Sequence, residues 1–147
     1  MYAVQTLRGA AGQHLTLGKR AVLAWFILFA VMFANGTARV VVLQPWLGED
    51  RARQVASLTG VVLVLLVAWL FVRMDPRATS RQLVWVGVGW LAGTLAFELL
   101  FGHFVSGLTW SALLADYNIL EGRLWSVVVI SVCLGPWMCG LLKSRGR

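Results

Sequence analysis

Two residues of opposite charge within long apolar stretches are the groups in this chain best placed to do chemistry. Arg39 lies in FANGTARVVVL, and Glu98 lies in LAGTLAFELLFG. A charge in the middle of a membrane span costs roughly 2.5–3.5 kcal/mol on insertion scales, so such residues face protein or water and tend to be paired. We expect Arg39 and Glu98 to form an interhelical ion pair or to share a polar pocket. Such a pair can serve packing alone, or it can serve transport or catalysis.

The stretches that carry these charges are long enough to cross a bilayer. Of the 147 residues, 59% are hydrophobic and 13% are charged, which lies outside the usage of a soluble domain. A helix needs roughly 20 apolar residues to span a bilayer. We therefore expect an all-α, integral membrane four-helix bundle that forms a single domain over 21–143. Its spans are 21–43, 55–72, 83–105 and 123–142.

Basic residues gather on one side of these spans. Because short basic loops stay in the cytoplasm, we expect both termini to be cytoplasmic, with 1–20 as one tail and 144–147 as a basic second tail. The expected location is a bacterial cytoplasmic (inner) membrane, with the bilayer as partner and no nucleic acid. A membrane protein or a second copy is a further candidate partner. Nine of the thirteen Lys and Arg residues lie on the expected cytoplasmic side: Arg8, Lys19, Arg20, Arg73, Arg77, Arg81, Lys143, Arg145 and Arg147.

Polar residues on the first three spans indicate which helix faces contact protein. On each span, a pair of polar residues three or four positions apart shares one face of the helix. We expect these pairs to surround a polar pocket in the outer half of the bundle. On the third span, Gly89 and Gly93 have GxxxG spacing on a nearly opposite face, so this helix should pack on both sides. The pocket residues are Asn35, Arg39, Gln54, Ser57, Thr94 and Glu98.

A short amphipathic helix is predicted between the third and fourth spans, at about 109–117. Trp110, Leu113, Leu114 and Tyr117 recur there at helical spacing. We expect this helix to lie in the outer membrane interface, or to fold over the mouth of the bundle as a lid. Polar residues near it form a second candidate site, the outer-face cluster. Its members are His103, Asp116, Tyr117, Asn118, Glu121 and Arg123.

Capping motifs place the starts of the helices. Thr79 and Gln82 have capping-box spacing, so the third helix should begin just after Thr79. Asn118 and Glu121 repeat this spacing before the fourth span, which gives Glu121 a structural role as an alternative to ligand binding. Asp50 is placed to cap the second helix.

Motifs for a cofactor or a metal do not occur in the sequence. Cys133 and Cys139 are six residues apart and form no CxxC pair, so the sequence contains no motif for thiol redox chemistry. The two histidines, His14 and His103, fall on opposite sides of the predicted bundle and cannot both ligate one haem. No spacing in the outer-face cluster matches a set of metal ligands. We expect no cofactor and no metal.

Two segments resemble small bacterial inner-membrane proteins that have no established activity. They are NGTARVVVLQPWLGEDRARQVASLTG and TLAFELLFGHFVSGLTWSALLADYNILEGRLW, with G-T-x-R, R-Q, F-E and L-x-D-Y-N-x-x-x-G arrangements. The resemblance covers most of the chain after residue 30 and implies the bacterial cytoplasmic membrane and the four-span plan. Small multidrug transporters of similar size place their essential carboxylate in the first span, where this chain has Arg39, so membership of that family is not expected.

Three functions follow as alternatives. The leading expectation is a non-enzymatic accessory, assembly or stabilising subunit of a larger membrane system, because the loops are short and the third span has two packing faces. The second is a small oligomeric transporter or channel in which Glu98 binds a proton or a cation and Arg39 modulates it. The third is a membrane enzyme that acts on a lipid-like substrate with the outer-face cluster.

Overall fold

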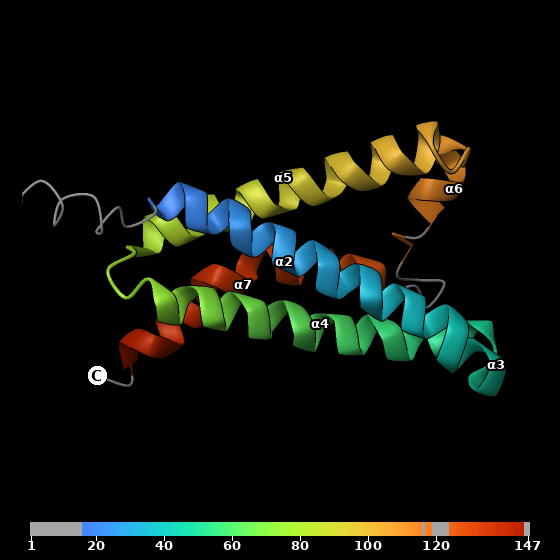
Figure 1. Ribbon diagram of the computed structural model, residues 1–147, viewed down its shortest axis with the longest axis horizontal. Helices are drawn as coiled ribbons and strands as arrows, with labels where there is room; N and C mark the ends of the chain where they lie inside the picture. The colour runs from blue at the N-terminus through green and yellow to red at the C-terminus, as the bar shows by residue number, and fades with distance from the viewer. Residues whose placement is uncertain (1–15, 116, 119–123, 146–147) are drawn as a thin grey trace, which may run out of the picture.

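The computed structural model describes residues 16–115, 117–118 and 124–145. Within these residues, all regular secondary structure is helical (Figure 1). The elements in chain order are α2 (Leu17–Ala38), η1 (Arg39–Leu43), α3 (Gln44–Leu47), α4 (Glu49–Met74), α5 (Ser80–Phe104), α6 (Trp110–Ala115) and α7 (Trp125–Arg145).

Four helical runs in the described part of the chain are long and apolar enough to cross a membrane. One coincides with each span that the sequence predicts, so an all-helical bundle with four long apolar helices is confirmed. The short helix α6 lies within the range predicted for an amphipathic helix. The four runs are Leu17–Leu47, Glu49–Met74, Ser80–Phe104 and Trp125–Ser144.

The first connection differs from its prediction, because helix fills nearly all of it. A loop was expected between the first span and a second helix that begins just after Asp50, but helix continues to Leu47 and only Gly48 separates α3 from α4. Its φ of 77° is one that glycine adopts without strain, which permits the sharp reversal. Gly48 is also the N-cap of α4, with no side-chain cap bond, so the predicted cap by Asp50 is wrong. Asp50 instead lies in the first turn, where it complements the helix dipole.

The long helices pack in a defined order around the bundle. Both α4 and α5 pack along α7, and α2 packs mainly on α4. The contact between α2 and α5 is less extensive, and α5 diverges from α4 toward the end that carries α6 (Figure 1). We call the end of the bundle that carries α3 the α3 end.

The capping box predicted for α5 is confirmed, since Thr79 and Gln82 each bond the other's backbone N–H.

Glycines set how closely α5 approaches its neighbours. A Cβ atom on Gly87 would lie 1.8 Å from the Cys133 carbonyl oxygen, so only glycine lets α5 and α7 come this close. On the GxxxG face, Gly93 packs against Trp25 of α2. A Cβ atom added to Gly93 would lie 3.1 Å from the nearest atom of the Trp25 ring. Gly89 has open space instead. The helix therefore packs on α7 and α2, while the Gly89 position stays uncovered.

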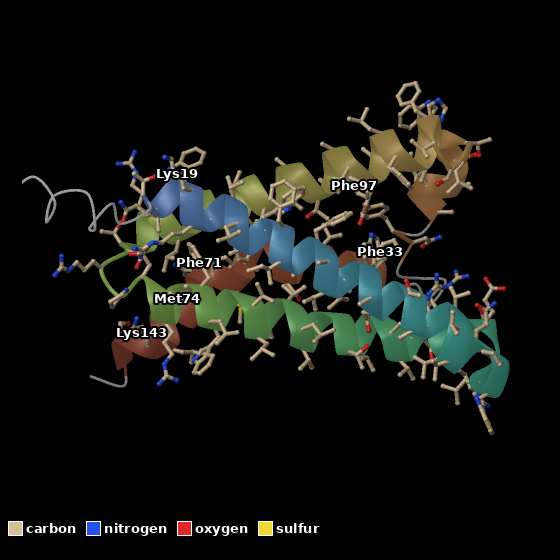
Figure 2. The ribbon with its side chains drawn as sticks, in the orientation of Figure 1. Lys19, Phe33, Phe71, Met74, Phe97 and Lys143 are labelled. Carbon is tan, nitrogen blue, oxygen red and sulfur yellow. The ribbon has the colours of Figure 1, made fainter. Side chains whose placement is uncertain are left out.

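The end opposite α3, which we call the basic end, holds most of the basic residues in the described part of the chain. Figure 2 shows Lys19, Met74 and Lys143 together at this end. Arg20 forms an ion pair of 3.2 Å with Asp75. The apolar core cluster extends from Phe71 of α4 near this end to Val128 near the start of α7. The basic residues at this end are Lys19, Arg20, Arg73, Arg77, Arg81 and Lys143.

Candidate functional site

The backbone around Arg39 changes from α-helical to π-helical geometry. The Arg39 N–H bonds to the carbonyls of both Asn35 and Gly36, and the Gln44 N–H bonds to the Arg39 carbonyl, five residues back. Pro45 follows directly and has no N–H to continue the α-helical ladder. π-Helical turns of this kind recur at functional sites. The local sequence therefore places Arg39 at a widened turn of the first long helix.

A cavity of about 510 Å³ lies in the half of the bundle toward the α3 end, and we call it the polar cavity. It is bounded by α2, η1, α4, α5 and α6 together with Tyr117 and Trp125. Charges of both signs line it, although the surrounding helices are apolar. The lining residues are Met32, Asn35, Gly36, Arg39, Glu49, Arg53, Ala56, Ser57, Phe97, Glu98, Leu99, Phe101, Gly102, Leu113, Tyr117 and Trp125.

Two neutral donors hold the carboxylate of Glu98. The Tyr117 hydroxyl donates to Glu98 Oε2 at 2.6 Å, and the Trp125 indole Nε1 donates to the same oxygen at 3.0 Å. Hydrogen bonds to a charged group contribute about 1.5–3 kcal/mol each. The Ser126 hydroxyl in turn donates to the Tyr117 carbonyl at 2.9 Å. Glu98 thus joins α5 to the segment after α6 and to the start of α7.

Arg39 and Glu98 share the polar cavity but do not form a direct ion pair. Within the described residues, the ion pairs are Arg20–Asp75 and Arg53–Glu49. Glu98 has the two donors given above, whereas the Arg39 guanidinium makes no hydrogen bond or ion pair with any described residue. The cavity therefore holds an arginine with unused donors beside a carboxylate that is already bonded.

The other residues of the predicted pocket divide between the cavity and its surroundings. Asn35 lines the cavity, where its amide donates to the Ala56 carbonyl at 2.8 Å, and Ser57 lines it as a buried residue. Gln54 is exposed outside the cavity, because it lies to one side of the face of α4 that carries Arg53 and Ser57. The remaining member, Thr94, lies in a second cavity.

This second cavity, the apolar crevice, has a volume of about 180 Å³ and lies between α2 and α5 against α7. In it the Trp25 Nε1 donates to the Thr94 hydroxyl at 3.2 Å. The crevice shares Met32, Phe97, Glu98 and Trp125 with the polar cavity, so the two meet at Glu98. Its lining residues are Trp25, Leu28, Phe29, Met32, Phe33, Thr94, Phe97, Glu98, Trp125, Val128, Val129 and Val132.

The outer-face cluster is not gathered into one site by the described residues. The His103 Nδ1 bonds to the Leu108 carbonyl at 2.9 Å, and its ring stacks on Trp110 with 4.1 Å between centroids, so His103 shapes the turn into α6. Tyr117 belongs to the polar cavity instead. The Asn118 N–H bonds to a carbonyl of α6, and Asp116, Glu121 and Arg123 lie outside the described residues.

In the described part of the chain, no group of three or more His, Cys, Asp or Glu residues comes together that could hold a metal ion.

The pair of hydrogen-bond donors on Glu98 is the feature of the site that sequence reasoning did not find. Trp125, which supplies one of them, was not among the site residues expected from the sequence. Its position at the start of the fourth apolar run gives no sign of a carboxylate partner, because that partner lies on another helix.

Comparison with protein-family models, with curated proteins and with solved structures found no match. The resemblance to small bacterial inner-membrane proteins stays a prediction. The two cavities and the groups that line them are therefore the basis for the functional interpretation.

Proposed function

We propose that this chain is a small multi-pass membrane protein that binds a charged ligand inside its bundle, as a small transporter or channel does. Glu98 is the site for a proton or a cation, and Arg39 is the second charged group of the site. One observation carries the proposal: these residues line one cavity of about 510 Å³ and are not paired with each other. Charges among apolar helices are costly, and they usually mark ion or substrate pathways.

The hydrogen bonds of Glu98 support a role in coupling. Bonds to an ionised carboxylate are roughly twice as strong as bonds between neutral groups. Uptake of a proton or cation by Glu98 would therefore weaken its bonds to Tyr117 and Trp125. Because Tyr117 follows α6 closely, this weakening would alter how the α6 region covers the polar cavity.

We propose the bacterial cytoplasmic membrane as the location, with both termini in the cytoplasm. The basic residues at one end of the bundle support this orientation, because short basic segments stay on the cytoplasmic side. The α3 end, with the polar cavity, would then lie in the outer half of the membrane. The bilayer is the constant partner of the chain, and a membrane protein or a second copy can be a further one.

A role as an accessory, assembly or stabilising subunit is the second candidate, and one observation favours it. Gly89 is exposed, and a Cβ atom there would have nothing within 4 Å. Small residues at GxxxG spacing let a neighbouring helix approach closely. A helix of another membrane protein could therefore pack over Gly89.

Flux through reconstituted vesicles tests the proposed function. Wild-type protein and Glu98→Gln are placed in liposomes, and the decay of an imposed proton or potassium gradient is followed with an internal dye. We expect faster decay with the wild type than with empty vesicles, and loss of that excess with Glu98→Gln. Asp50→Asn is the matched control, because it removes an exposed carboxylate that does not line the cavity.

Two outcomes would contradict this proposal. Either the wild type moves neither protons nor potassium, or Glu98→Gln conducts as the wild type does. Purification from native membranes in a mild detergent, with mass spectrometry, decides the second candidate. A stoichiometric protein partner that is lost in Gly89→Phe, and kept in Gly36→Phe, would favour the accessory role.

A further inference from the structure

We infer that the ligand of this site is an amphiphile with a phosphate-bearing head and a hydrocarbon chain, which enters sideways from the bilayer between α2 and α5. The inference rests on the proposed function and deepens it: Glu98 keeps the proton or cation, and the amphiphile is the second ligand, the one that Arg39 binds. The head would occupy the polar cavity and the chain would occupy the apolar crevice.

The two cavities together have the shape of an amphiphile site. They differ in chemistry, since four charged residues line one, and Phe29 and Val129 line the other. The four charged residues are Arg39, Glu49, Arg53 and Glu98. The two cavities meet at Glu98 and share its neighbours on both sides. A molecule that fills both must therefore be polar at one end and apolar at the other. An ion or a small polar solute would leave the crevice unused.

The crevice opens on the side of the bundle. It lies between α2 and α5, which contact each other less extensively than α2 contacts α4 or α5 contacts α7. Phe33 and Phe97, one from each helix, line the crevice and are still 70% and 37% exposed (Figure 2). In a bundle of membrane-spanning helices, this side faces the hydrocarbon of the bilayer. A chain can thus reach the crevice without crossing water.

One charged group of the polar cavity selects the head group. Arg53 pairs with Glu49, and Glu98 accepts bonds from Tyr117 and Trp125. The guanidinium of Arg39 lines the polar cavity and makes no bond to any described residue. Arginine carries five donors in a planar fork that binds phosphate oxygens in pairs. Pockets of several hundred Å³ hold whole small molecules, so about 510 Å³ gives room for a phosphodiester and a small head alcohol. The occupant that fits both chemistry and size is a phospholipid.

Binding to the full-length protein in detergent micelles tests the inference by native mass spectrometry. Three probes distinguish recognition of the head group from recognition of the hydrocarbon chains. Phosphatidylglycerol has both the phosphate head and the chains, glycerol 3-phosphate has a phosphate head without chains, and diacylglycerol has the chains without the phosphate. We expect phosphatidylglycerol to be retained at one molecule per chain, ahead of the other two. Arg39→Gln should weaken its binding about tenfold, the effect of losing one charge-assisted bond. Arg51→Gln, at an exposed position outside both cavities, should leave it unchanged.

A second pair of variants tests the crevice. Val129→Phe places a larger side chain in the crevice and should lower retention of phosphatidylglycerol. Val127→Phe makes the same change on an exposed position of α7 that lines neither cavity, and it should retain the lipid. The melting temperature of each variant separates blocked binding from unfolding. If Arg39→Gln does not fold, Arg39→Lys keeps the charge without the fork and should bind more weakly than the wild type.

Several results would overturn the inference. Equal binding of glycerol 3-phosphate would make this a site for polar solutes, and equal binding of diacylglycerol would remove the role of the phosphate. Retention unaffected by both Arg39→Gln and Val129→Phe would mean that the lipid is only annular. If any of these results is obtained while the wild type still shows ion flux that depends on Glu98, the proposed function stands and only this inference fails. If the wild type binds the lipid but shows no ion flux, the proposed function alone is contradicted.

Discussion

The Tyr117 hydroxyl lies 2.6 Å from Glu98 Oε2, a short hydrogen bond between the segment after α6 and the last third of α5. This distance is typical of a hydroxyl that donates to an ionised carboxylate. The Tyr117 carbonyl also accepts a bond from Ser126. The bond therefore ties together three parts of the chain that meet at the polar cavity.

Tyr117→Phe should destabilise the bundle, because it removes one donor to Glu98 and leaves the ring in place. We expect the free energy of unfolding to fall by about 1.5–3 kcal/mol, the contribution of a hydrogen bond to a charged group. Denaturant unfolding in micelles, followed by tryptophan fluorescence, measures this loss. Ser131→Ala is the control, since its hydroxyl bonds only its own helix on an exposed face. In a Glu98→Gln background, Tyr117→Phe should cost less; an equal cost would contradict the coupling.

Arg39→Gln and Glu98→Gln should have nearly additive effects on stability, because the two side chains do not bond directly. We expect the double variant to differ from the sum of the single variants by less than about 0.5 kcal/mol, as for independent sites. A direct ion pair would instead make the double variant less destabilised than the sum. Measured unfolding of the four proteins of this cycle distinguishes the two arrangements.

Local chemistry explains what the sequence could predict about the fold. The capping box at Thr79 and Gln82 depends on residues three apart, and helix α5 begins where it indicates. The four apolar runs are likewise visible along the chain. The short helix α3 was missed, because a loop and a short helix can have the same composition. What decides between them is the backbone conformation of one glycine.

The site could be predicted only in part, because partners on different helices have no fixed spacing in sequence. Asn35, Arg39, Ser57 and Glu98 were expected at one pocket, and all four line the polar cavity. Thr94 was expected with them, but an indole from α2 bonds it in the crevice. Helical periodicity gives the face of one helix, whereas the rotation of one helix against another decides which faces meet.

Gly87→Ala should be strongly destabilising, and Gly89→Ala should not. The added methyl group at position 87 would lie 1.8 Å from the Cys133 carbonyl oxygen, so α5 and α7 would have to separate. Overpacking of this kind costs about 1–3 kcal/mol or more. At position 89 the methyl group meets open space, and alanine should stabilise the helix by about 0.4–1 kcal/mol. Thermal unfolding of both variants checks the prediction, and equal losses would contradict the close approach of α5 to α7.

Gly36→Cys should react with charged, membrane-impermeant thiol reagents, and Gly89→Cys should not. Both glycines have open space around an added Cβ, but only Gly36 lines the polar cavity. The reactions use a background with Cys133→Ala and Cys139→Ala, in intact cells. Because Arg39 lines the same cavity, an anionic reagent should react faster than a cationic one of the same size, and Arg39→Gln should remove that preference. Reaction at Gly36→Cys only in inverted vesicles would contradict the proposed orientation, and equal reaction at both positions would contradict a polar cavity within the bundle.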